Sequence, residues 1–318
     1  MEKGSGFVTG VEPPPLSLEQ PVLGPPVLDV RGLCKSFGSF AAVRDLNLTL
    51  KEGEIYGFLG RNGAGKTTTI RMLMGVVKPR RGTIRLFDEE KTFYGRSKYK
   101  QRVGYISQVQ YFYPWMTCAG IGKFVGGFYK TWDRQEYAGL LTKLDLPPKR
   151  KVSALSHGMK TKLALALALA HRPPLLILDE PTAGLDPVTR RDFLEMILVQ
   201  KKEHGRTVIF STHLLEDVER TADTIGVIAK GCMRYEGPLH ELKRYVRRVT
   251  PKTPDAGPET LEARGLEVLR DVSGEEGRAW FAAGGPAGWR GLNPDYEVEA
   301  LPLEDVFVEL SGKALTNL

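Results

Sequence analysis

Residues 54–68 read EIYGFLGRNGAGKTT, and this stretch decides the fold. Residues 54–59 have the apolar composition of a buried β-strand, and a helix is expected from residue 65 to about residue 75. The segment between them, residues 60–67, matches GxxxxGK[ST] completely. A strand, a glycine-rich loop and a helix in this order predict a phosphate-binding loop, because the loop N–H groups and the helix N-terminus both favour an anion.

The side chains of this loop indicate how it would hold a nucleotide. Lys66 is placed to reach the β- and γ-phosphates, and the hydroxyl of Thr67 to hold Mg²⁺. The alternative is a glycine-rich turn that binds no ligand, but the complete strand, loop and helix favour a nucleotide site. The residues predicted to contact ATP, with Mg²⁺ as cofactor, are Gly60, Asn62, Gly63, Ala64, Gly65, Lys66, Thr67 and Thr68.

A second apolar run ends in two acids. Residues 175–180 read LLILDE, which is typical of a buried strand with carboxylates at its exposed end. Because α/β proteins place chemistry at strand ends beside the nucleotide loop, Asp179 is predicted to ligate Mg²⁺. Glu180 could polarise the attacking water as a general base. The alternative, a polar turn that begins the next helix, does not explain why two acids follow four aliphatic residues.

Strands and helices alternate along the middle of the chain. Further short apolar runs are RVGYISQ (102–108), TVIFST (207–212) and TIGVIAK (224–230). Strands that are apolar throughout, with helices between them, indicate a buried parallel sheet in an α/β fold. Residues 120–171 have a mostly helical pattern, interrupted by PPKRK at 147–151. A helical subdomain inserted into the α/β core is therefore expected.

The two ends of the chain differ from the middle in composition. Residues 1–26 are rich in Pro and Gly and show no periodicity, so we expect a flexible leader. A helix is expected over GPLHELKRYVRRV (237–249), ending near Thr250. The segment PKTPDAGPE then interrupts the pattern. The remaining residues predict a small α+β tail that closes with a helix over residues 303–312.

The composition excludes several classes of protein. Hydrophobic residues make up 42% of the chain and charged residues 26%, as in a soluble globular protein. Neither a transmembrane helix nor secretion is expected, because the chain has no apolar run of bilayer length and its N-terminus has no apolar signal core. The three cysteines are far apart, which argues for a reducing compartment and against a cysteine metal site.

The charge of the chain is unevenly distributed. The net charge is +7, yet the residues from Cys232 onward include 11 basic and 15 acidic side chains. The basic excess therefore belongs to the first part of the chain. A nucleotide, a nucleic acid or an anionic membrane surface would each suit this excess, and so would a solvated basic face.

Six motifs occur in an order that resembles one family. GRNGAGKT is followed by Gln108, LSHGM (155–159), LLILDE, AGLD (183–186) and Thr212-His213. This ordered set resembles the ATP-binding cassette (ABC) ATPases over about residues 27–240. The resemblance implies a P-loop NTPase fold with a parallel-sheet core, an antiparallel β subdomain and a helical subdomain at about residues 117–171. Residues 241–318 would then form a C-terminal accessory extension.

LSHGM corresponds to the signature motif of this family. In ABC ATPases two subunits pack head to tail, and the signature helix of one presses on the γ-phosphate held by the other. The resemblance therefore implies that Ser156, which also caps the expected helix, offers its hydroxyl and Gly158 a bare backbone N–H to the partner's ATP. The commonest signature is LSGGQ, so His157 and Met159 are departures. The missing amide at Met159 suggests slower turnover rather than an inactive site.

Four further residues take their expected roles from the resemblance. Phe37 matches the aromatic residue that stacks on adenine, with core packing as the alternative. Gln108 matches the residue that touches Mg²⁺ and the attacking water. Asp186 matches the acid that communicates across the dimer, and His213 the histidine that contacts the γ-phosphate. The expected catalytic residues are Glu180, His213, Lys66 and Gln108, and the expected metal ligands are Thr67, Gln108 and Asp179.

The leading hypothesis is an ATP-hydrolysing motor subunit. Residues 111–133 and the segment LEDVFVEL resemble the exporter group whose membrane permease is a separate chain. The expected partners are a permease and a second ABC ATPase subunit, identical or homologous, at the cytoplasmic face of the membrane. The aromatic segment YFYPWM (111–116) and a helix over residues 117–131 would form the groove that receives the permease, unless these aromatics pack in the core.

Two other functions compete with this hypothesis. A soluble ABC ATPase that remodels a nucleic-acid or macromolecular complex would suit the basic excess. Chromosome and repair ATPases, however, insert long coiled coils before the signature, where this chain has about ninety residues, and ribosome-associated factors carry two cassettes. No nucleic-acid partner is therefore expected. A scaffold that binds ATP without turnover is disfavoured by the presence of Glu180 and His213.

Overall fold

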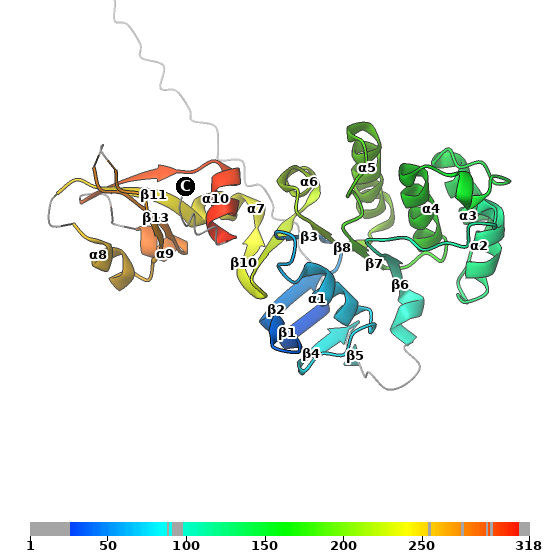
Figure 1. The fold of residues 1–318 in the computed structure, drawn as a ribbon, viewed down its shortest axis with the longest axis horizontal. Helices are drawn as coiled ribbons and strands as arrows, with labels where there is room; N and C mark the ends of the chain where they lie inside the picture. Colours follow the sequence, from blue (N-terminus) through cyan, green and yellow to red (C-terminus); the bar gives the residue numbers. More distant parts are fainter. Residues whose placement is uncertain are drawn as a thin grey trace, which may run out of the picture.

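The computed structural model describes residues 26–311 apart from 88, 91–97, 254–255, 275–276, 291 and 293–294. Figure 1 shows a central sheet with an antiparallel sheet on one side of it, a group of helices near one end and a smaller unit at the other end. The leader expected over residues 1–26 lies outside the described residues except for Pro26. Within the described part of the chain, no helix is long and apolar enough to cross a membrane.

The central sheet is parallel, as predicted. Its pairs are all parallel except β9 with β10 at one edge. The strand order is β10 (Cys232–Pro238), β9 (Thr224–Ala229), β3 (Ile55–Leu59), β8 (Thr207–Thr212), β7 (Leu175–Asp179) and β6 (Val103–Ile106).

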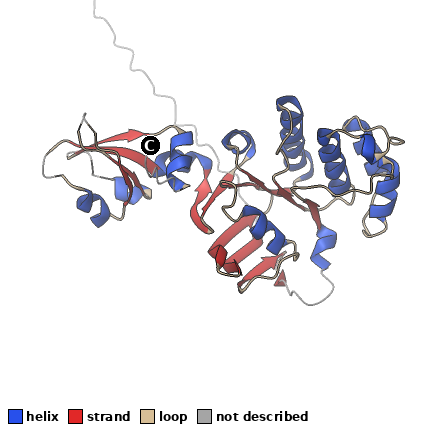
Figure 2. Ribbon diagram, viewed as in Figure 1, coloured by secondary structure: helices blue, strands red, loops and turns tan. Residues whose placement is uncertain are grey.

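Both faces of this sheet are covered, which explains why its strands read as continuous apolar runs. Leu175 and Ile177 pack into a core shared with the antiparallel sheet and α1 (Lys66–Leu73). Leu176 and Leu178 pack into a second core on the opposite face. Figure 2 shows helices along the sheet on this side, and those contributing to the second core include α4 (His157–Leu169), α5 (Pro187–His204) and α6 (Leu215–Thr221).

The register of the central strands brings the predicted motifs together. Asp179 of β7 lies opposite Ser211 of β8, and Thr212 lies opposite Leu59 of β3. Because parallel strands share one carboxyl edge, the loop that follows Leu59 and the acids at the end of β7 meet there. The sheet therefore positions the nucleotide loop beside Asp179 and Glu180.

The predicted antiparallel β subdomain is confirmed. All of its paired strands run antiparallel, and β1 and β2 form a long hairpin whose turn contains Gly38 at φ +56°. The strand order is β2 (Phe40–Lys51), β1 (Pro26–Phe37), β4 (Arg81–Leu86) and β5 (Glu89–Glu90).

The helical subdomain contains α2 (Cys118–Gly126) and α3 (Arg134–Lys143) in addition to α4. The Asp133 carboxylate caps α3 by accepting the N–H groups of Gln135 and Glu136. Tyr137 of α3 donates its hydroxyl to Cys118 O at 2.6 Å. The Tyr137 ring lies so close to Gly122 that a Cβ there would be 2.0 Å from it. The two helices therefore approach as closely as this glycine permits.

Two short 3₁₀ turns flank this pair of helices. η1 (Lys98–Arg102) precedes α2, and η2 (Val152–Ala154) follows α3.

The C-terminal extension is an α+β unit, as predicted. Its antiparallel sheet has the order β12 (Glu267–Asp271), β13 (Trp280–Ala283), β11 (Val246–Pro251) and β14 (Tyr296–Ala300). The helices are α7 (Leu239–Tyr245), α8 (Pro258–Ala263), α9 (Pro286–Trp289) and α10 (Leu303–Leu310). The helix expected near residues 303–312 is thus present as α10.

The helix expected up to Thr250 is wrong beyond Tyr245. Residues 246–251 form β11, which pairs with β13 on one side and β14 on the other. Val246 and Val249 are both fully buried. Their β-branched side chains suit a strand, and two neighbouring strands outweigh the helical periodicity of the preceding residues.

The extension packs directly against the central α/β unit. Leu242 of α7 and Val306 and Leu310 of α10 belong to the same buried cluster as the central sheet. The boundary expected at residue 240 falls inside α7. One hydrophobic core therefore runs across that boundary.

His171 predicts a pH dependence of stability. Its ring is 1% exposed and stacks on Tyr129 at 3.9 Å between ring centroids. Burial lowers the pKa of His171 from its usual 6.5 to about 4. Between these two values the unfolded chain binds more protons than the folded chain, so stability is lost as the pH falls from 6.5 toward 4.

For His171→Phe, which keeps a flat ring, this loss should disappear. From pH 7 to pH 5 the wild type should lose about 2 kcal/mol more unfolding free energy than the variant. Urea unfolding at both pH values measures the difference. Equal losses in the two proteins would contradict the assignment.

Candidate active site

The nucleotide loop keeps the glycine geometry that its motif predicts. Gly63 and Gly65 have φ values of +80° and +113°, which residues with a side chain rarely adopt. A Cβ on Gly65 would lie 2.6 Å from Ala42 O, and one on Gly60 would lie 2.6 Å from Ile228 O. The loop is therefore tightly packed against β2 and β9, and its backbone is held at the N-terminus of α1.

Lys66, Glu180 and His213 form a row of contacting side chains beside this loop. Lys66 Nζ donates to Gly60 O at 2.6 Å and lies 3.0 Å from Glu180 Oε1. The other carboxylate oxygen of Glu180 lies 3.1 Å from His213 Nδ1. The side chains of Lys66 and Glu180 are only 3% and 6% exposed, so this contact is well shielded from water.

Glu180 has a strained backbone. Its φ of +46° lies in the left-handed region, which is uncommon for a residue other than glycine. Ser211 holds this conformation, because its hydroxyl accepts the Glu180 N–H at 2.9 Å. The carboxylate is thereby turned toward Lys66 and His213 rather than continuing the direction of β7.

Thr67 and Asp179 provide oxygen ligands next to this row. The Thr67 hydroxyl donates to Asp179 Oδ1 at 3.1 Å, and the Ser211 hydroxyl donates to the same oxygen at 2.9 Å. Burial raises the pKa of Asp179, while the two hydroxyl bonds oppose that rise. A hydroxyl and a carboxylate side by side fit the donor set that Mg²⁺ prefers.

The signature motif lies at the N-terminus of α4. The Ser156 hydroxyl accepts the Met159 N–H at 3.2 Å, which confirms the predicted N-cap. A Cβ on Gly158 would lie 3.1 Å from Thr189 Cγ2 on α5. A glycine in the first turn of α4 therefore has a structural reason within this chain, the close approach of α5.

His157 has a definite partner that no motif in the sequence predicts. His157 Nε2 lies 3.1 Å from Ala183 O, in the turn that carries AGLD. The same turn continues to Asp186, which caps α5 by accepting the N–H groups of Val188 and Thr189. The Thr189 bonds lower the pKa of Asp186 and keep it ionised. The contact between His157 Nε2 and Ala183 O thus links the signature motif to the AGLD turn.

His157→Gly, which restores the commonest residue at this position, should remove the contact with Ala183 O. We expect ATP turnover to fall about twofold to tenfold, the range set by one net hydrogen bond, with little change in MgATP affinity. Steady-state rates and nucleotide titrations measure the two effects. An unchanged turnover rate would show that the contact with Ala183 has no role in the reaction.

Two predicted residues lie apart from this network. Phe37, at the end of β1, is 51% exposed, so core packing is the wrong interpretation, and Lys35 Nζ lies 5.0 Å from its ring centroid. Gln108 is exposed in a bend beyond the end of β6, not within the strand. Among the described residues, no hydrogen bond or ion pair joins Ser156 or Asp186 to the nucleotide loop. The structure therefore brings Lys66, Thr67, Asp179, Glu180 and His213 together at the nucleotide loop. Of the other predicted residues, Phe37, Gln108, Ser156 and Asp186 are exposed on the surface.

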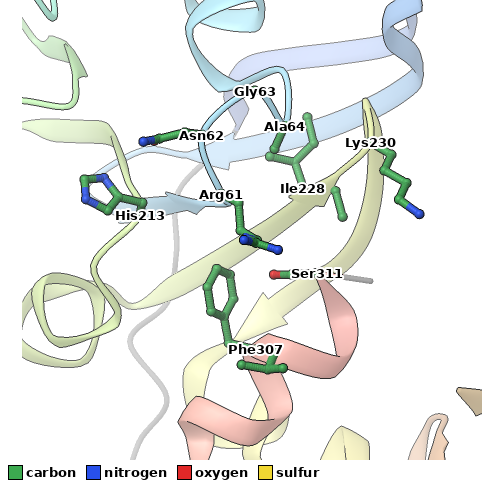
Figure 3. Close-up of a pocket in the computed structure, with 11 residues that line it drawn as sticks. Arg61, Asn62, Gly63, Ala64, His213, Ile228, Lys230, Phe307 and Ser311 are labelled. Atoms are coloured by element: carbon green, nitrogen blue, oxygen red, sulfur yellow. The ribbon is translucent and has the colours of Figure 1, made fainter. Parts of the chain in front are cut away.

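The C-terminal extension contributes to the surroundings of the loop. Figure 3 shows Phe307 of α10 and Ser311, which directly follows this helix, facing Arg61 and the rest of the loop. These residues line one cavity of about 540 Å³. His213 and Lys230 line the same cavity. Neither α10 nor Ser211 was among the predicted site residues. Ser211 could have been found as a polar residue near the end of the apolar run TVIFST, whereas α10 carries no local signal.

Comparisons with known proteins agree with this geometry. Residues 43–183 match the family model described as ABC transporter. The chain is 40% identical over 225 residues to the bacitracin transport ATP-binding protein BcrA of Bacillus licheniformis, covering 70% of this chain and 73% of that one. It is 35% identical over 304 residues to the Nod factor export ATP-binding protein I of Burkholderia lata, covering 91% and 98%. The second match includes the C-terminal extension.

Solved structures of similar fold are ABC cassettes. A structure described as the ATP-binding subunit of an ABC transporter has 29% identity and a TM-score of 0.63, and it covers 69% of this chain and 92% of that one. The dimeric cassette MJ0796 has 22% identity and a TM-score of 0.62, covering 67% and 98%, and it supports the fold. The chain therefore belongs to the family of ABC transporter ATP-binding proteins and is an ATPase of that family.

Proposed function

We propose that this chain is the motor subunit of an exporter, acting at the cytoplasmic face of the membrane on a separate permease. The observation that carries the proposal is the buried pair of Lys66 and Glu180, in contact with His213, beside Thr67 and Asp179. Relatives named for bacitracin transport and Nod factor export favour a transporter over the remodelling of a nucleic-acid complex.

MgATP would enter the loop with its phosphates against the N-terminus of α1. Thr67 and Asp179 would hold Mg²⁺, which neutralises charge on the phosphates, and Gln108 would have to move toward them. Lys66 would exchange its Glu180 contact for phosphate oxygens. Glu180, still beside His213, would then be free to accept a proton from water. The exposed ring of Phe37 would stack on adenine.

The surface half of the site would serve a second cassette. Ser156, Gly158 and Asp186 lie at helix N-termini, and Ser156 is exposed. A partner's γ-phosphate approaching them would meet N–H groups, a hydroxyl and a favourable helix dipole. ATP held by both chains favours the closed dimer directly, because a ligand stabilises the state that it binds better. Both a homodimer and a heterodimer with a homologous cassette are compatible with this arrangement.

The permease would bind an exposed aromatic surface on the helical subdomain. Its members Tyr111, Tyr113, Trp115, Phe124 and Phe128 are all exposed, Tyr111 by 90%. Ring contacts at 5.0, 5.7 and 5.3 Å connect Trp115, Tyr113, Phe124 and Phe128 in that order. Core packing is therefore wrong for these five, and the four rings in contact form a contiguous apolar patch of the kind typical of a protein interface.

Affinity purification from detergent-solubilised membranes tests the proposal. The tagged chain, with MgATP, should retain a polytopic membrane protein in stoichiometric amount. The double variant Trp115→Ser/Phe128→Ser should lose most of it, because large aromatic residues dominate binding at interfaces. Val76→Ser, at an apolar residue 67% exposed elsewhere on the surface, is the matched control.

The alternatives give different results in the same experiment. Recovery of soluble protein or nucleic acid without a membrane protein would contradict the transporter proposal and leave the ATPase assignment intact. Equal recovery of the permease by the double variant and the control would retain the transporter and reject the aromatic surface.

A further inference from the structure

A second cavity lies away from the nucleotide loop, between the ATPase core and the C-terminal extension. Its volume is about 750 Å³, within the usual range for a small-molecule site. Its walls come from β10, α7, the start of β11 and the segment that contains α9. It shares no lining residue with the cavity at the nucleotide loop.

Three aromatic side chains form part of its lining. Tyr235 of β10 and Tyr245 of α7 pack edge to face at 5.0 Å between ring centroids. Trp289 of α9 donates its indole N–H to Gly284 O at 2.8 Å, which fixes the orientation of its ring. Tyr235 lies in β10, Tyr245 in α7 and Trp289 in α9, so three separate elements supply the aromatic walls.

The charged groups of the cavity are mainly guanidinium groups. Arg244, Arg247 and Arg290 line it, and within the described parts of the chain none of them has a carboxylate within 4.0 Å. The Arg247 guanidinium lies 5.3 Å from the ring centroid of Trp289. A fourth arginine in the lining, Arg234, is neutralised by Glu267 at 3.0 Å.

Two acids also line the cavity, and each has another contact. Glu236 accepts the Thr49 N–H at 2.9 Å and lies 3.1 Å from the Tyr56 hydroxyl. Glu241 Oε1 lies 4.0 Å from His240 Nε2. The three arginines without a carboxylate partner outnumber these two acids, so a positive excess faces the aromatic walls.

We propose that this cavity binds an anion that carries a planar ring, of about the size of a nucleoside monophosphate. Guanidinium groups bind phosphate through paired N–H donors, and they keep their charge at all physiological pH values. A planar ring would stack against Trp289 and the tyrosines.

The test uses the full chain labelled with [15N]tryptophan and saturated with Mg·AMPPNP, so that the nucleotide loop is filled. The chain has four tryptophans, which give four indole N–H signals, and Trp289→Phe identifies the one from the cavity. Titration with GMP should shift the Trp289 signal saturably. Guanosine, which lacks the phosphate, and glycerol 3-phosphate, which lacks the ring, should each bind at least about tenfold more weakly.

Two arginine variants complete the test. Arg244→Ala and Arg290→Ala, both at exposed residues, should each weaken GMP binding about tenfold or more. Arg248→Ala, at a neighbouring arginine outside the cavity that pairs with Glu299, should leave the affinity unchanged. No shift of the Trp289 signal at millimolar GMP would overturn the proposal. Equal binding of glycerol 3-phosphate would also overturn it, because the ring would then contribute nothing.

Discussion

Glu180→Gln should lower the rate of ATP hydrolysis at least about hundredfold, because it removes the base placed to accept a proton from water. MgATP should still bind, since Lys66 keeps its contacts with Gly60 O and Arg61 O and remains beside the loop. Nucleotide that binds and is not hydrolysed should hold two chains together. We expect a stable dimer in the presence of MgATP, measured by light scattering after size-exclusion chromatography.

The matched control is Glu195→Gln, which removes a carboxylate from an exposed surface pair with Arg191 and Arg220. This control should hydrolyse ATP at the wild-type rate. A Glu180→Gln protein that stays monomeric with MgATP would contradict the proposed dimer. One that hydrolyses ATP normally would show that another group is the base.

Lys66→Ala should weaken MgATP binding at least about hundredfold, because bonds from a charged donor to phosphate contribute about 1.5–3 kcal/mol each. The same change should destabilise the protein without nucleotide. Glu180 would keep its buried position beside His213 but lose the ammonium group of Lys66, and breaking a buried pair costs about 3 kcal/mol.

The double variant Lys66→Ala/Glu180→Gln separates these two effects. Removing the second charge should recover most of the lost stability without restoring MgATP binding. Thermal unfolding and nucleotide titration of the wild type, both single variants and the double variant form the complete cycle. A double variant as unstable as Lys66→Ala alone would show that the ion pair does not explain the destabilisation.

The central fold follows from sequence because its signals are local. A glycine loop after an apolar strand, and acids after another, predict a parallel sheet with its chemistry at one edge. The contact of Lys66 with Glu180 and the hydrogen bond of Thr67 to Asp179 agree with this prediction. The helix expected through Thr250 is wrong because β13 and β14, distant in sequence, pair with residues 246–251.

Other features depend on contacts that no short segment encodes. His157 gains its role only because the turn at Ala183 lies beside it. Phe307 faces the nucleotide loop across the cavity because α10 packs on the central core. The aromatic residues between 111 and 128 could have been buried or exposed, and only the packing of α2 and α3 decides which. Tertiary packing, not sequence periodicity, determines these positions.

Mixing two inactive variants tests most directly whether each ATP lies between two chains. Lys66→Ala has an intact signature but cannot bind ATP well. Ser156→Glu, at an exposed residue, keeps the loop but places a negative charge where the partner's phosphate would approach. Half of the dimers in an equal mixture contain both chains, and each such dimer has one complete site. ATP hydrolysis should therefore rise to about a quarter of the wild-type rate. A mixture no more active than its two components would contradict a site shared between chains.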